Sequence, residues 1–577
     1  MKPDTPGLNT RTLSVAIAGS GGSGAVTAGT ILLQAAAKAG LYGLMTRSAG
    51  PQIRGGESAS MLRIGSTPVA CMNDSFDLLI GLDWLNAGRF AQEIPLSDAS
   101  VILTDDAAGE VPEPFLTSGA SVREMAFKEQ AATVEDGRLN MVAVGAAGAL
   151  LGLPQAAVEA AARKELNDKG SDVIEASVAC IALGYASAAD AEFSTPIDHT
   201  AQRARWNISG NEACGLGALR GGVRFVAAYP ITPASDMLEW LAPHLEELGG
   251  SLVQAEDELA SINMIVGASF GGVPALTATS GPGLSLMSEG LGLAVASETP
   301  VVLIDVTRGG PSTGIPTKPE QSDLNIALYG MHGEAPHLVL APLDVRDCVF
   351  TTQWAVRLAE HLQTVAIVLS DQSLGQARAV TDPPIKFEQR LERKTDSSPT
   401  ENYRRYAPIA DSISPMTLPG IARGMYTADG LEHDERGIPS SVATDHLQQL
   451  GKRRAKIETF DYGTHWAELY GSGELCVICW GSASGAVREA AGRLEGAGLT
   501  LRVIALRLLA PLRREALQQA LAGSVHVWVV EQNHSAQLYH YLRAHEALPA
   551  AARSFARPGP LPLRPGEIIE AIAPQDQ

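Results

Sequence analysis

Cysteine is scarce and scattered in this chain. The 577 residues include six cysteines, at positions 71, 180, 214, 348, 476 and 479. So few dispersed cysteines suggest free thiols in a reducing compartment, and nothing resembles the cysteine run of a ferredoxin-type cluster. Cys476 and Cys479 form a lone C-x-x-C in a strand-like run, where residues three apart point to opposite faces of a sheet. We therefore interpret both as core cysteines and predict no metal site in this chain.

Positive charge is in deficit, and long apolar runs are missing. The chain has 44 Lys and Arg against 64 Asp and Glu, a formal net charge of −20. This balance argues against nucleic acid and anionic membranes as main partners. Glycine, proline or charge interrupts every apolar run before it reaches the length of a membrane span. Asp4 and two prolines precede the first strand-like run, which is not a signal-peptide pattern, so we expect a cytoplasmic protein.

What is present is the patterning of a multidomain globular protein. Apolar residues make up 45% and charged residues 19%, and the length suggests about four units of ordinary size. In residues 1–195, strand-like runs alternate with Ala-rich helical patterns, which predicts an α/β domain. Strands are expected at Leu13–Ala18, Leu41–Thr46, Leu78–Leu82 and Ser100–Thr104, and helices at Ala25–Ala39, Asn140–Leu166 and Ser171–Ala188.

Two further α/β domains are predicted downstream. Residues 205–385 alternate strand-like and helix-like runs, which favours a mostly parallel, doubly wound sheet, and residues 471–577 show βαβαβα order. Residues 386–470 between them are charged and contain several Pro and Gly. We interpret them as an ordered inter-domain segment that wraps a neighbouring surface rather than forming a core. His433, among acidic neighbours in this segment, is interpreted as part of a charged loop rather than a metal ligand.

Four polar, turn-rich motifs follow one another between Tyr229 and Thr317. Each follows a strand-like run or opens a helix-like one, which is where open α/β sheets bind ligands. A core needs no such residues there, so the pattern predicts a cofactor and substrate wall. The motifs are Tyr229-Pro-Ile-Thr-Pro233, Gln254-Ala-Glu-Asp-Glu258, Thr279-Ser-Gly-Pro-Gly283 and the loop Arg308–Thr317.

Each motif also has an interpretation without a ligand. Thr232, restricted between two prolines, presents a preorganised hydroxyl to a substrate oxygen or else caps a helix that begins near Ser235. The carboxylates of Glu256–Glu258 suit a helix N-terminus, but three exceed what its dipole needs, so one is available to a ligand. Glycines 281 and 283 allow close backbone approach. Arg308 at a strand end suits a carboxylate clamp, with Thr317 as a second donor.

The first domain carries a glycine-rich turn and two arginines of interest. Residues 19–24 satisfy G-x-G-x-x-G between a strand and a helix, the context of a dinucleotide site. The next strand ends at Arg47 without an acid for the ribose. We therefore favour a turn that lets helix and strand pack closely, and an anion site at the helix start stays open. Arg54, in the following turn, is either solvated or binds a carboxylate.

Together these residues resemble the 2-oxoacid:ferredoxin oxidoreductases, thiamine-diphosphate and iron–sulfur enzymes that form acyl-CoA from 2-oxoacids. The resemblance is to a γ-type domain fused ahead of an α-type chain, most like the 2-oxoglutarate enzyme. It implies a Rossmann-like γ-type domain over 1–195, a pyrimidine-binding domain over 205–385 and a transketolase C-terminal-like domain over 471–577. Beside the four motifs, it is carried by Gly19–Gly24, Ile53–Gly56, His332–Glu334, Leu431–Asp434 and Glu531–Asn533.

The resemblance implies a role for each site residue. Glu258, Arg308 and Thr232 would be the catalytic residues, with Glu258 hydrogen-bonded to the thiamine aminopyrimidine. Thr232, Arg308 and Thr317 would hold the oxo and carboxylate oxygens of the substrate. Arg54, or less favourably Arg47, would supply the cation for the distal carboxylate of 2-oxoglutarate. The cofactor would also contact Tyr229, Pro230, Ile231, Gly281 and Gly283.

By the same resemblance the chain holds half a site. It has no Gly-Asp-Gly motif for Mg²⁺ and the diphosphate, and no cysteines for a cluster. A separate β subunit would carry Mg²⁺ and a 4Fe–4S cluster, take CoA as co-substrate with this chain, and reduce ferredoxin. The implied assembly is a dimer of αβ heterodimers that decarboxylates a 2-oxoacid or runs in reverse. Alternatives are pyruvate or branched-chain 2-oxoacids as substrate, a nucleotide-dependent dehydrogenase, or a non-catalytic scaffold.

Overall fold

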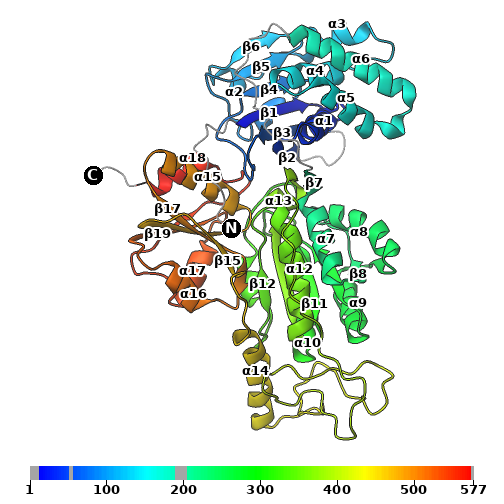
Figure 1. Cartoon of the computed structure of the whole chain (residues 1–577), viewed down its shortest axis with the longest axis vertical. Coiled ribbons are helices and arrows are strands. Elements are labelled where there is room, and N and C mark those ends of the chain that lie inside the picture. Colours follow the sequence, from blue (N-terminus) through cyan, green and yellow to red (C-terminus); the bar gives the residue numbers. More distant parts are fainter. Residues whose placement is uncertain (1–11, 51–55, 189–204, 574–577) are drawn as a thin grey trace. The chain divides into compact units, whose positions relative to one another are not determined.

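The computed structural model describes residues 12–50, 56–188 and 205–573, and they form two compact units (Figure 1). The N-terminal unit comprises the described residues up to Ser209, together with Ala377–Pro383 and Arg564–Gly566. The main unit comprises Gly210–Gln376, Pro384–Leu563 and the described residues from Glu567 onward. All sheets are flanked by helices, so the predicted α/β class is confirmed.

The N-terminal unit is built on one eight-stranded mixed sheet with the order β6-β5-β4-β1-β3-β2-β14-β7. β1 pairs in parallel with β4 on one side and antiparallel with β3 on the other. The strands are β1 (Thr12–Gly19), β2 (Tyr42–Ala49), β3 (Ser58–Gly65), β4 (Leu78–Gly81), β5 (Val101–Thr104), β6 (Ser121–Glu124), β7 (Trp206–Ser209) and β14 (Arg378–Thr381). The helices are α1 (Ala25–Lys38), α2 (Glu113–Leu116), α3 (Phe127–Ala132), α4 (Leu139–Leu150), α5 (Gln155–Glu165) and α6 (Ser171–Ala188), with short 3-10 turns at 87–90, 106–108 and 167–169.

Two details of this unit differ from the sequence expectation. The helix expected over Asn140–Leu166 is two helices, because Gly152 adopts a φ of 70° and Pro154 follows it, which ends α4 before α5 begins. The second strand is also not the neighbour of the first, since β3 lies between β1 and β2. A dinucleotide fold needs those two strands side by side, so the arrangement contradicts the dehydrogenase alternative.

Among the described helices, α6 alone is long and apolar enough to cross a membrane by length and composition, a test that core helices of globular proteins also pass. The expectation that every apolar run is too short therefore has this one exception. α6 packs tightly on α4: a Cβ at Gly145 would lie 2.1 Å from the Ile181 carbonyl oxygen, and one at Gly184 would lie 2.0 Å from that of Val142. Such close backbone approach is typical of helices packed in a protein interior, and we interpret α6 as a core helix.

The main unit contains a seven-stranded sheet with the order β18-β12-β13-β11-β10-β8-β9. Every strand from β9 to β12 in that order runs parallel, and only β18 is antiparallel. The strands are β8 (Phe225–Ala228), β9 (Ser251–Gln254), β10 (Ala275–Thr279), β11 (Val301–Thr307), β12 (Leu338–Leu340), β13 (Val365–Asp371) and β18 (Leu508–Ala510). Its helices are α7 (Gly210–Gly221), α8 (Ser235–Glu247), α9 (Glu258–Phe270), α10 (Gly281–Ala296), α11 (Leu324–Tyr329), α12 (Val345–Leu362) and α13 (Gln372–Gln376).

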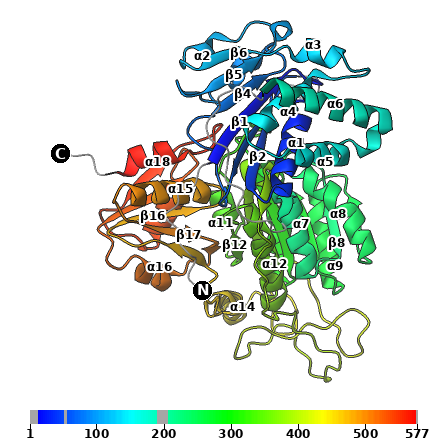
Figure 2. The same ribbon diagram turned by 45° about the horizontal axis from the view of Figure 1, so that its top comes forward.

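A five-stranded sheet, β15-β17-β16-β19-β20, completes the main unit. β15 is antiparallel and the other four strands are parallel, with α15 and α16 on opposite faces (Figures 1 and 2). Cys476 and Cys479 lie buried in β16, and burial raises the pKa of their thiols to about 11 and about 12. The elements are β15 (Ala467–Tyr470), β16 (Leu475–Trp480), β17 (Leu501–Leu506), β19 (His526–Glu531), β20 (Arg553–Ala556), α15 (Ala483–Gly496), α16 (Arg514–Ala520), α17 (Gln537–Ala544) and α18 (Pro565–Ile572).

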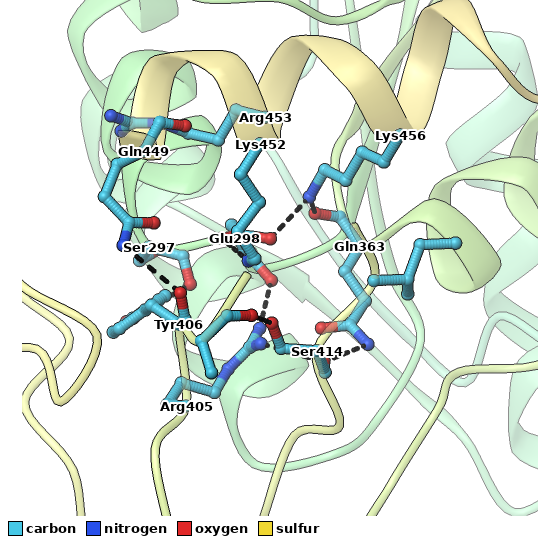
Figure 3. A network of polar contacts seen from close by, with 12 residues as sticks. Ser297, Glu298, Gln363, Arg405, Tyr406, Ser414, Gln449, Lys452, Arg453 and Lys456 are labelled. Carbon is cyan, nitrogen blue, oxygen red and sulfur yellow. Dashed lines mark hydrogen bonds and ion pairs between the residues drawn. The ribbon is translucent and has the colours of Figure 1, made fainter. Parts of the chain in front are cut away.

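The segment between β14 and this sheet, residues 386–470 of the sequence analysis, contributes to a buried core. It runs as loops and then forms α14 (Ala443–Glu458), which charge patterning alone did not predict. Figure 3 shows how α14 is anchored: the ammonium groups of Lys452 and Lys456 both bond the carboxylate of Glu298, at 2.8 Å for Lys456, and all three side chains are 1% exposed. Arg405 donates to the Glu298 backbone carbonyl at 2.9 Å. The expectation of a surface wrapping without a core is therefore wrong, because this segment closes a buried polar core.

His433 lies in a loop with acidic neighbours, as the sequence indicated, but its own side chain is buried rather than solvated. It is 2% exposed, and its ring lies against that of Tyr406 with a centroid distance of 3.9 Å. Its two ring nitrogens contact the carbonyl oxygens of Asp434 and Ala296. These contacts hold the loop against the end of α10, so the histidine has a packing role.

Candidate active site

The turn after β8 is fixed from two sides. The side-chain amide of Asn211 donates to the Pro233 carbonyl at 2.9 Å, and Arg308 Nη1 donates to the Thr232 carbonyl at 2.5 Å. The Thr232 side chain is exposed and does not cap α8, whose N-cap residue is Ala234 and has no side-chain cap bond. The capping alternative for Thr232 is therefore wrong, and its backbone carbonyl is bonded to the Arg308 guanidinium in the turn after a parallel strand.

The three carboxylates after β9 have three different environments. Glu256 is exposed, Asp257 caps α9 through a 2.7 Å bond from the Ala260 amide, and Glu258 is 7% exposed at the first position of the helix. Helix capping accounts for Asp257, and solvation accounts for Glu256. Only Glu258 turns its side chain inward without either explanation, which is the choice that the sequence favoured.

Glu258 meets the glycine-rich start of α10. A Cβ at Gly283 would lie 3.0 Å from Glu258 Oε1 and 2.0 Å from Thr279 Oγ1. Farther along, a Cβ at Gly290 would lie 2.7 Å from a methyl carbon of Ile262, so the contact with α9 extends along α10 from Gly283 to Gly290. Glycine at these positions is required by close packing, and it brings a buried carboxylate beside the free backbone amides of a helix N-terminus.

Arg308 follows β11 and is 7% exposed. Burial lowers the pKa of its guanidinium, against the opposing fields of Asp323 and Asp305. Its Nε has no hydrogen-bond partner among the described residues. A buried guanidinium with an unused donor, held by one carbonyl, is suited to receive a carboxylate or oxo group.

The loop after Arg308 folds back on itself. The Gly309 amide donates to the Lys318 carbonyl at 3.1 Å, and the Ile315 amide donates to the Gly309 carbonyl at 2.7 Å. This closure returns Thr317 to the strand end that carries Arg308. The described contacts do not include a bond between the two side chains, so Thr317 as a second donor remains a prediction.

Sequence reasoning missed two aspartates and a glutamine at this edge. Asp305 lies inside the apolar run of β11, where a charged residue is itself a signal, and Asp323 precedes α11 with its carboxylate against Gly281. Gln321 forms two hydrogen bonds with Gln532 at the end of β19: its amide donates to the Gln532 carbonyl, and its Oε1 accepts from the Gln532 amide. Glu531, beside it, is fully buried and receives amide bonds from Leu538 and Tyr539.

In the N-terminal unit, the glycine-rich turn has a packing explanation. A Cβ at Gly24 would lie 2.2 Å from Asn140 Nδ2, and one at Gly19 would lie 2.4 Å from Ser23 Oγ. These contacts are close packing within the turn and against α4, so the glycines have a packing role, although not the helix–strand contact that the sequence favoured. Arg47 is exposed on β2, and Arg54 lies outside the described residues, so neither is tested as a substrate ligand.

The main unit thus has a polar edge where the parallel strands β8, β9, β10 and β11 end. A buried glutamate, a glycine-cradled helix start and a buried arginine meet there. Among the described residues, no group of three or more His, Cys, Asp and Glu side chains could hold a metal ion. The fold and this edge define a cofactor-binding protein of the open parallel α/β class.

Comparisons with known proteins identify the family. A family model described as pyruvate flavodoxin/ferredoxin oxidoreductase, thiamine diphosphate-binding, matches residues 216–452, and one described as pyruvate ferredoxin/flavodoxin oxidoreductase matches residues 14–187. The 2-oxoglutarate synthase subunit KorA of Methanothermobacter marburgensis is 36% identical over 63% of this chain and 97% of its own length. The chain belongs to the 2-oxoacid:ferredoxin oxidoreductase family.

Two further relatives give the extent of the likeness. The 2-oxoacid:ferredoxin oxidoreductase subunit alpha of Saccharolobus solfataricus is 36% identical over 57% of this chain, and the match spans only 55% of that protein. The solved 2-oxoglutarate:ferredoxin oxidoreductase from Magnetococcus marinus, with 2-oxoglutarate, coenzyme A and succinyl-CoA bound, is 34% identical. That structure superimposes with a TM-score of 0.89 over 97% of this chain and 99% of its own. The predicted family is confirmed.

Proposed function

We propose that this chain is a γ–α fused subunit of a CoA-dependent 2-oxoacid:ferredoxin oxidoreductase. With a separate β subunit it would convert 2-oxoglutarate and CoA to succinyl-CoA and CO₂ while reducing ferredoxin, or run the reverse carboxylation. The observation that carries the proposal is the meeting of Glu258, Gly283 and Arg308 at one edge of a parallel sheet. The ligands named for the Magnetococcus marinus relative support 2-oxoglutarate over pyruvate or branched-chain 2-oxoacids.

The residues at this edge fit thiamine diphosphate. The bound cofactor supplies the electron sink that decarboxylation of a 2-oxoacid requires. Gly283 lets Thr279 and Glu258 pack directly against the first turn of α10, so the Glu258 carboxylate lies beside that glycine-rich backbone. Glu258 would hold a proton on the aminopyrimidine from there, because a buried carboxylate exchanges a proton with a ligand that it contacts directly. Tyr229, Pro230 and Ile231 would form the wall beside it, with the α10 backbone from Gly281 opposite.

Arg308 and its neighbours would hold the substrate. Arg308 has a free donor and a low-dielectric setting, where charge stabilisation is strongest. It would bind the carboxylate of the 2-oxoacid and oppose the charge that builds up as CO₂ leaves. Thr232 and Thr317 would donate hydroxyls to the oxo and carboxylate oxygens. Arg54 is our candidate for the distal carboxylate of 2-oxoglutarate, with Arg47 as the second choice.

The exposed side chains around the edge support a partner subunit. Tyr229 is 42% exposed, and Leu259 and Leu286, which follow Glu258 and Gly283, are each 50% exposed. Apolar side chains gathered at the mouth of a polar site are typical of a protein interface. The partner would bring the Gly-Asp-Gly motif, Mg²⁺ and the 4Fe–4S cluster, and two such αβ pairs would associate in the cytoplasm.

Co-expression with the partner tests the proposal. The purified complex should reduce a low-potential dye with 2-oxoglutarate only when CoA is present, and Glu258→Gln should lower kcat by at least about 100-fold, as expected for loss of a positioned proton carrier. Reduction by the lone chain would refute the two-subunit assignment. A rate with pyruvate that exceeds the rate with 2-oxoglutarate would overturn the substrate assignment, and Arg54→Ala should affect only the dicarboxylate.

A further inference from the structure

Behind Arg308 lie two carboxyl groups that share one environment. Asp305 is fully buried in β11, and its Oδ2 accepts a 3.0 Å bond from the Thr307 hydroxyl. Asp323 stands before α11, with its carboxylate against Gly281 at the first position of α10. The two carboxyl groups lie close enough to act on each other, and both act on Arg308 through their charge. The pair therefore connects the Arg308 strand end with the glycine-rich helix start.

Two buried carboxyl oxygens of this pair lack a donor. Asp305 Oδ1 and Asp323 Oδ2 are both buried, and neither has a hydrogen-bond partner among the described residues. Two ionised carboxylates can only accept hydrogen bonds, so a proton held between the two side chains is what would pair these oxygens. In agreement, burial and the neighbouring acid hold the pKa of Asp305 well above its usual range, and burial raises that of Asp323 to about 6.

The surroundings indicate which partner carries the proton. Asp323 lies at the N-terminus of α10, whose dipole and free amides favour an anion. Asp305 has no such support and lies in the sheet interior. The other charged groups that act on the pair are Arg308 and Glu320 on the preceding loop, and Asp371 lies on the neighbouring strand, opposite Thr307. Glu320 acts on Asp323, and Asp371 is bonded to Ser482.

The backbone around Asp323 is held rigidly by the five-stranded sheet. The Gln321 amide donates to the Gln532 carbonyl at 2.7 Å, and the Gln532 amide donates to Gln321 Oε1 at 2.8 Å. Gln537 bonds the Ser322 carbonyl and the Asn325 amide, at 2.8 Å each. The residues on both sides of Asp323 are therefore fixed, and so is the distance between the two carboxyls.

We propose that Asp305 and Asp323 hold a single proton and act together as positioning residues for Arg308, so that the guanidinium meets the substrate carboxylate with one negative charge behind it. A fully ionised pair would leave a net negative charge at this edge and would repel an anionic 2-oxoacid. The pair with one proton balances Arg308 and lets it act as a donor. This inference rests on the proposed function, because it takes Arg308 as the substrate ligand.

Infrared spectroscopy of the full chain tests the proton directly. At about pH 8, where ordinary aspartates are ionised, the wild type should show the carbonyl stretching band of a protonated carboxyl group. Asp305→Asn should abolish that band, whereas Asp371→Asn, which removes a second buried carboxyl at the neighbouring strand end, should retain it. A band that persists in Asp305→Asn overturns the proposal. If Asp305→Asn does not fold, Asp323→Asn should shift the band in its place. A band that stays at the same frequency in Asp323→Asn would also overturn the proposal.

Kinetics of the reconstituted complex test the effect on Arg308. In the wild type, KM for the 2-oxoacid should rise by at least about tenfold on the alkaline side as the last proton leaves the pair, an effect equal to about one pKa unit of interaction. Asp305→Asn keeps a neutral side chain of the same shape, so its KM should stay flat with pH. If KM for the 2-oxoacid still rises on the alkaline side in Asp305→Asn, the pair does not position Arg308. Absence of any turnover would refute the proposed function, whereas the infrared band would still decide whether the proton is shared.

Discussion

Replacing Glu298 by glutamine should destabilise the main unit strongly. Glu298, Lys452 and Lys456 are each 1% exposed, and the one carboxylate serves both ammonium groups (Figure 3). The buried Arg405 guanidinium is also held at this residue through the backbone carbonyl. The substitution removes the only anion of the group and leaves three cations in a low-dielectric interior. Breaking a buried pair in this way costs about 3–5 kcal/mol.

The two lysines and Arg405 contribute unequally to that loss. Burial already lowers the pKa of Lys456 to about 7 in the wild type, against about 10.4 in an unfolded chain. At pH 7 the wild type therefore already bears most of the cost of neutralising Lys456, and the substitution adds less than about 1 kcal/mol through this side chain. The rest of the loss falls on Lys452 and on the buried Arg405 guanidinium, which cannot release its proton. We therefore keep the estimate of about 3–5 kcal/mol for a broken buried pair.

The sign of the pH dependence follows from the same shift. A lysine whose pKa is lower in the folded state binds more protons when unfolded, so stability increases with pH between about 7 and the unfolded value of about 10.4. In Glu298→Gln both lysines lose their counter-charge, which lowers their pKa further. The deficit of the variant should therefore shrink as pH rises through this window.

Urea unfolding followed by hydrogen exchange in peptides of α14 and α10 is the suitable assay, because two units need not unfold together. The matched control is Glu458→Gln, which removes a glutamate from the exposed Arg454–Glu458 pair of the same helix. Such a pair contributes about 0.5 kcal/mol or less. A loss below about 1 kcal/mol in Glu298→Gln, or a deficit that grows with pH, would refute the reasoning.

Three further substitutions test the site. Gly283→Ala places a methyl group 2.0 Å from Thr279 Oγ1, so thiamine diphosphate binding measured by calorimetry should weaken at least about tenfold. The control Gly292→Ala, on the open side of α10, should leave binding unchanged and add up to about 1 kcal/mol of stability. Equal effects of the two variants would contradict a special requirement for glycine at position 283. Arg308→Lys keeps the charge but loses the planar fork, so kcat/KM for the 2-oxoacid should fall at least about tenfold, and an unchanged value would exclude a bidentate role. Gln532→Ala removes bonds to the Pro319 and Leu561 carbonyls, and substrate KM should rise more than cofactor Kd; the reverse order would place its effect elsewhere.

Local patterns were enough to predict the strands that carry the site. β11 and β13 are near-continuous apolar runs, as expected for parallel strands that are buried on both faces. Because parallel strands end at a common edge, the polar residues after β8, β9, β10 and β11 had to gather there. Local patterns did not single out Glu258 among its acidic neighbours. That choice came from the family resemblance, and the structure agrees with it because Asp257 caps α9 while Glu258 is buried.

Long-range partners could not be predicted in this way. β3 enters the first sheet between β1 and β2, and β18 is added to the second sheet from more than a hundred residues downstream. Neither pairing has a local signature. α14 was missed for another reason: its buried face carries Lys452 and Lys456, which periodicity counts as a solvated face. Only the position of Glu298, far away in sequence, turns those charges into an interior.

Helix α10 connects these two regions. Its first turn, Gly281–Gly283, borders Glu258 and Asp323, and Glu298 follows its last turn within the ionic cluster. Sixteen residues at 1.5 Å per residue place the two ends about 24 Å apart, which is too far for direct electrostatic influence through solvent at physiological salt. The cluster can act on the site only by fixing the axis of a rigid helix. We therefore expect Glu298→Gln to weaken thiamine diphosphate binding through a tilt of α10. Unchanged binding would show that the two ends of α10 move independently.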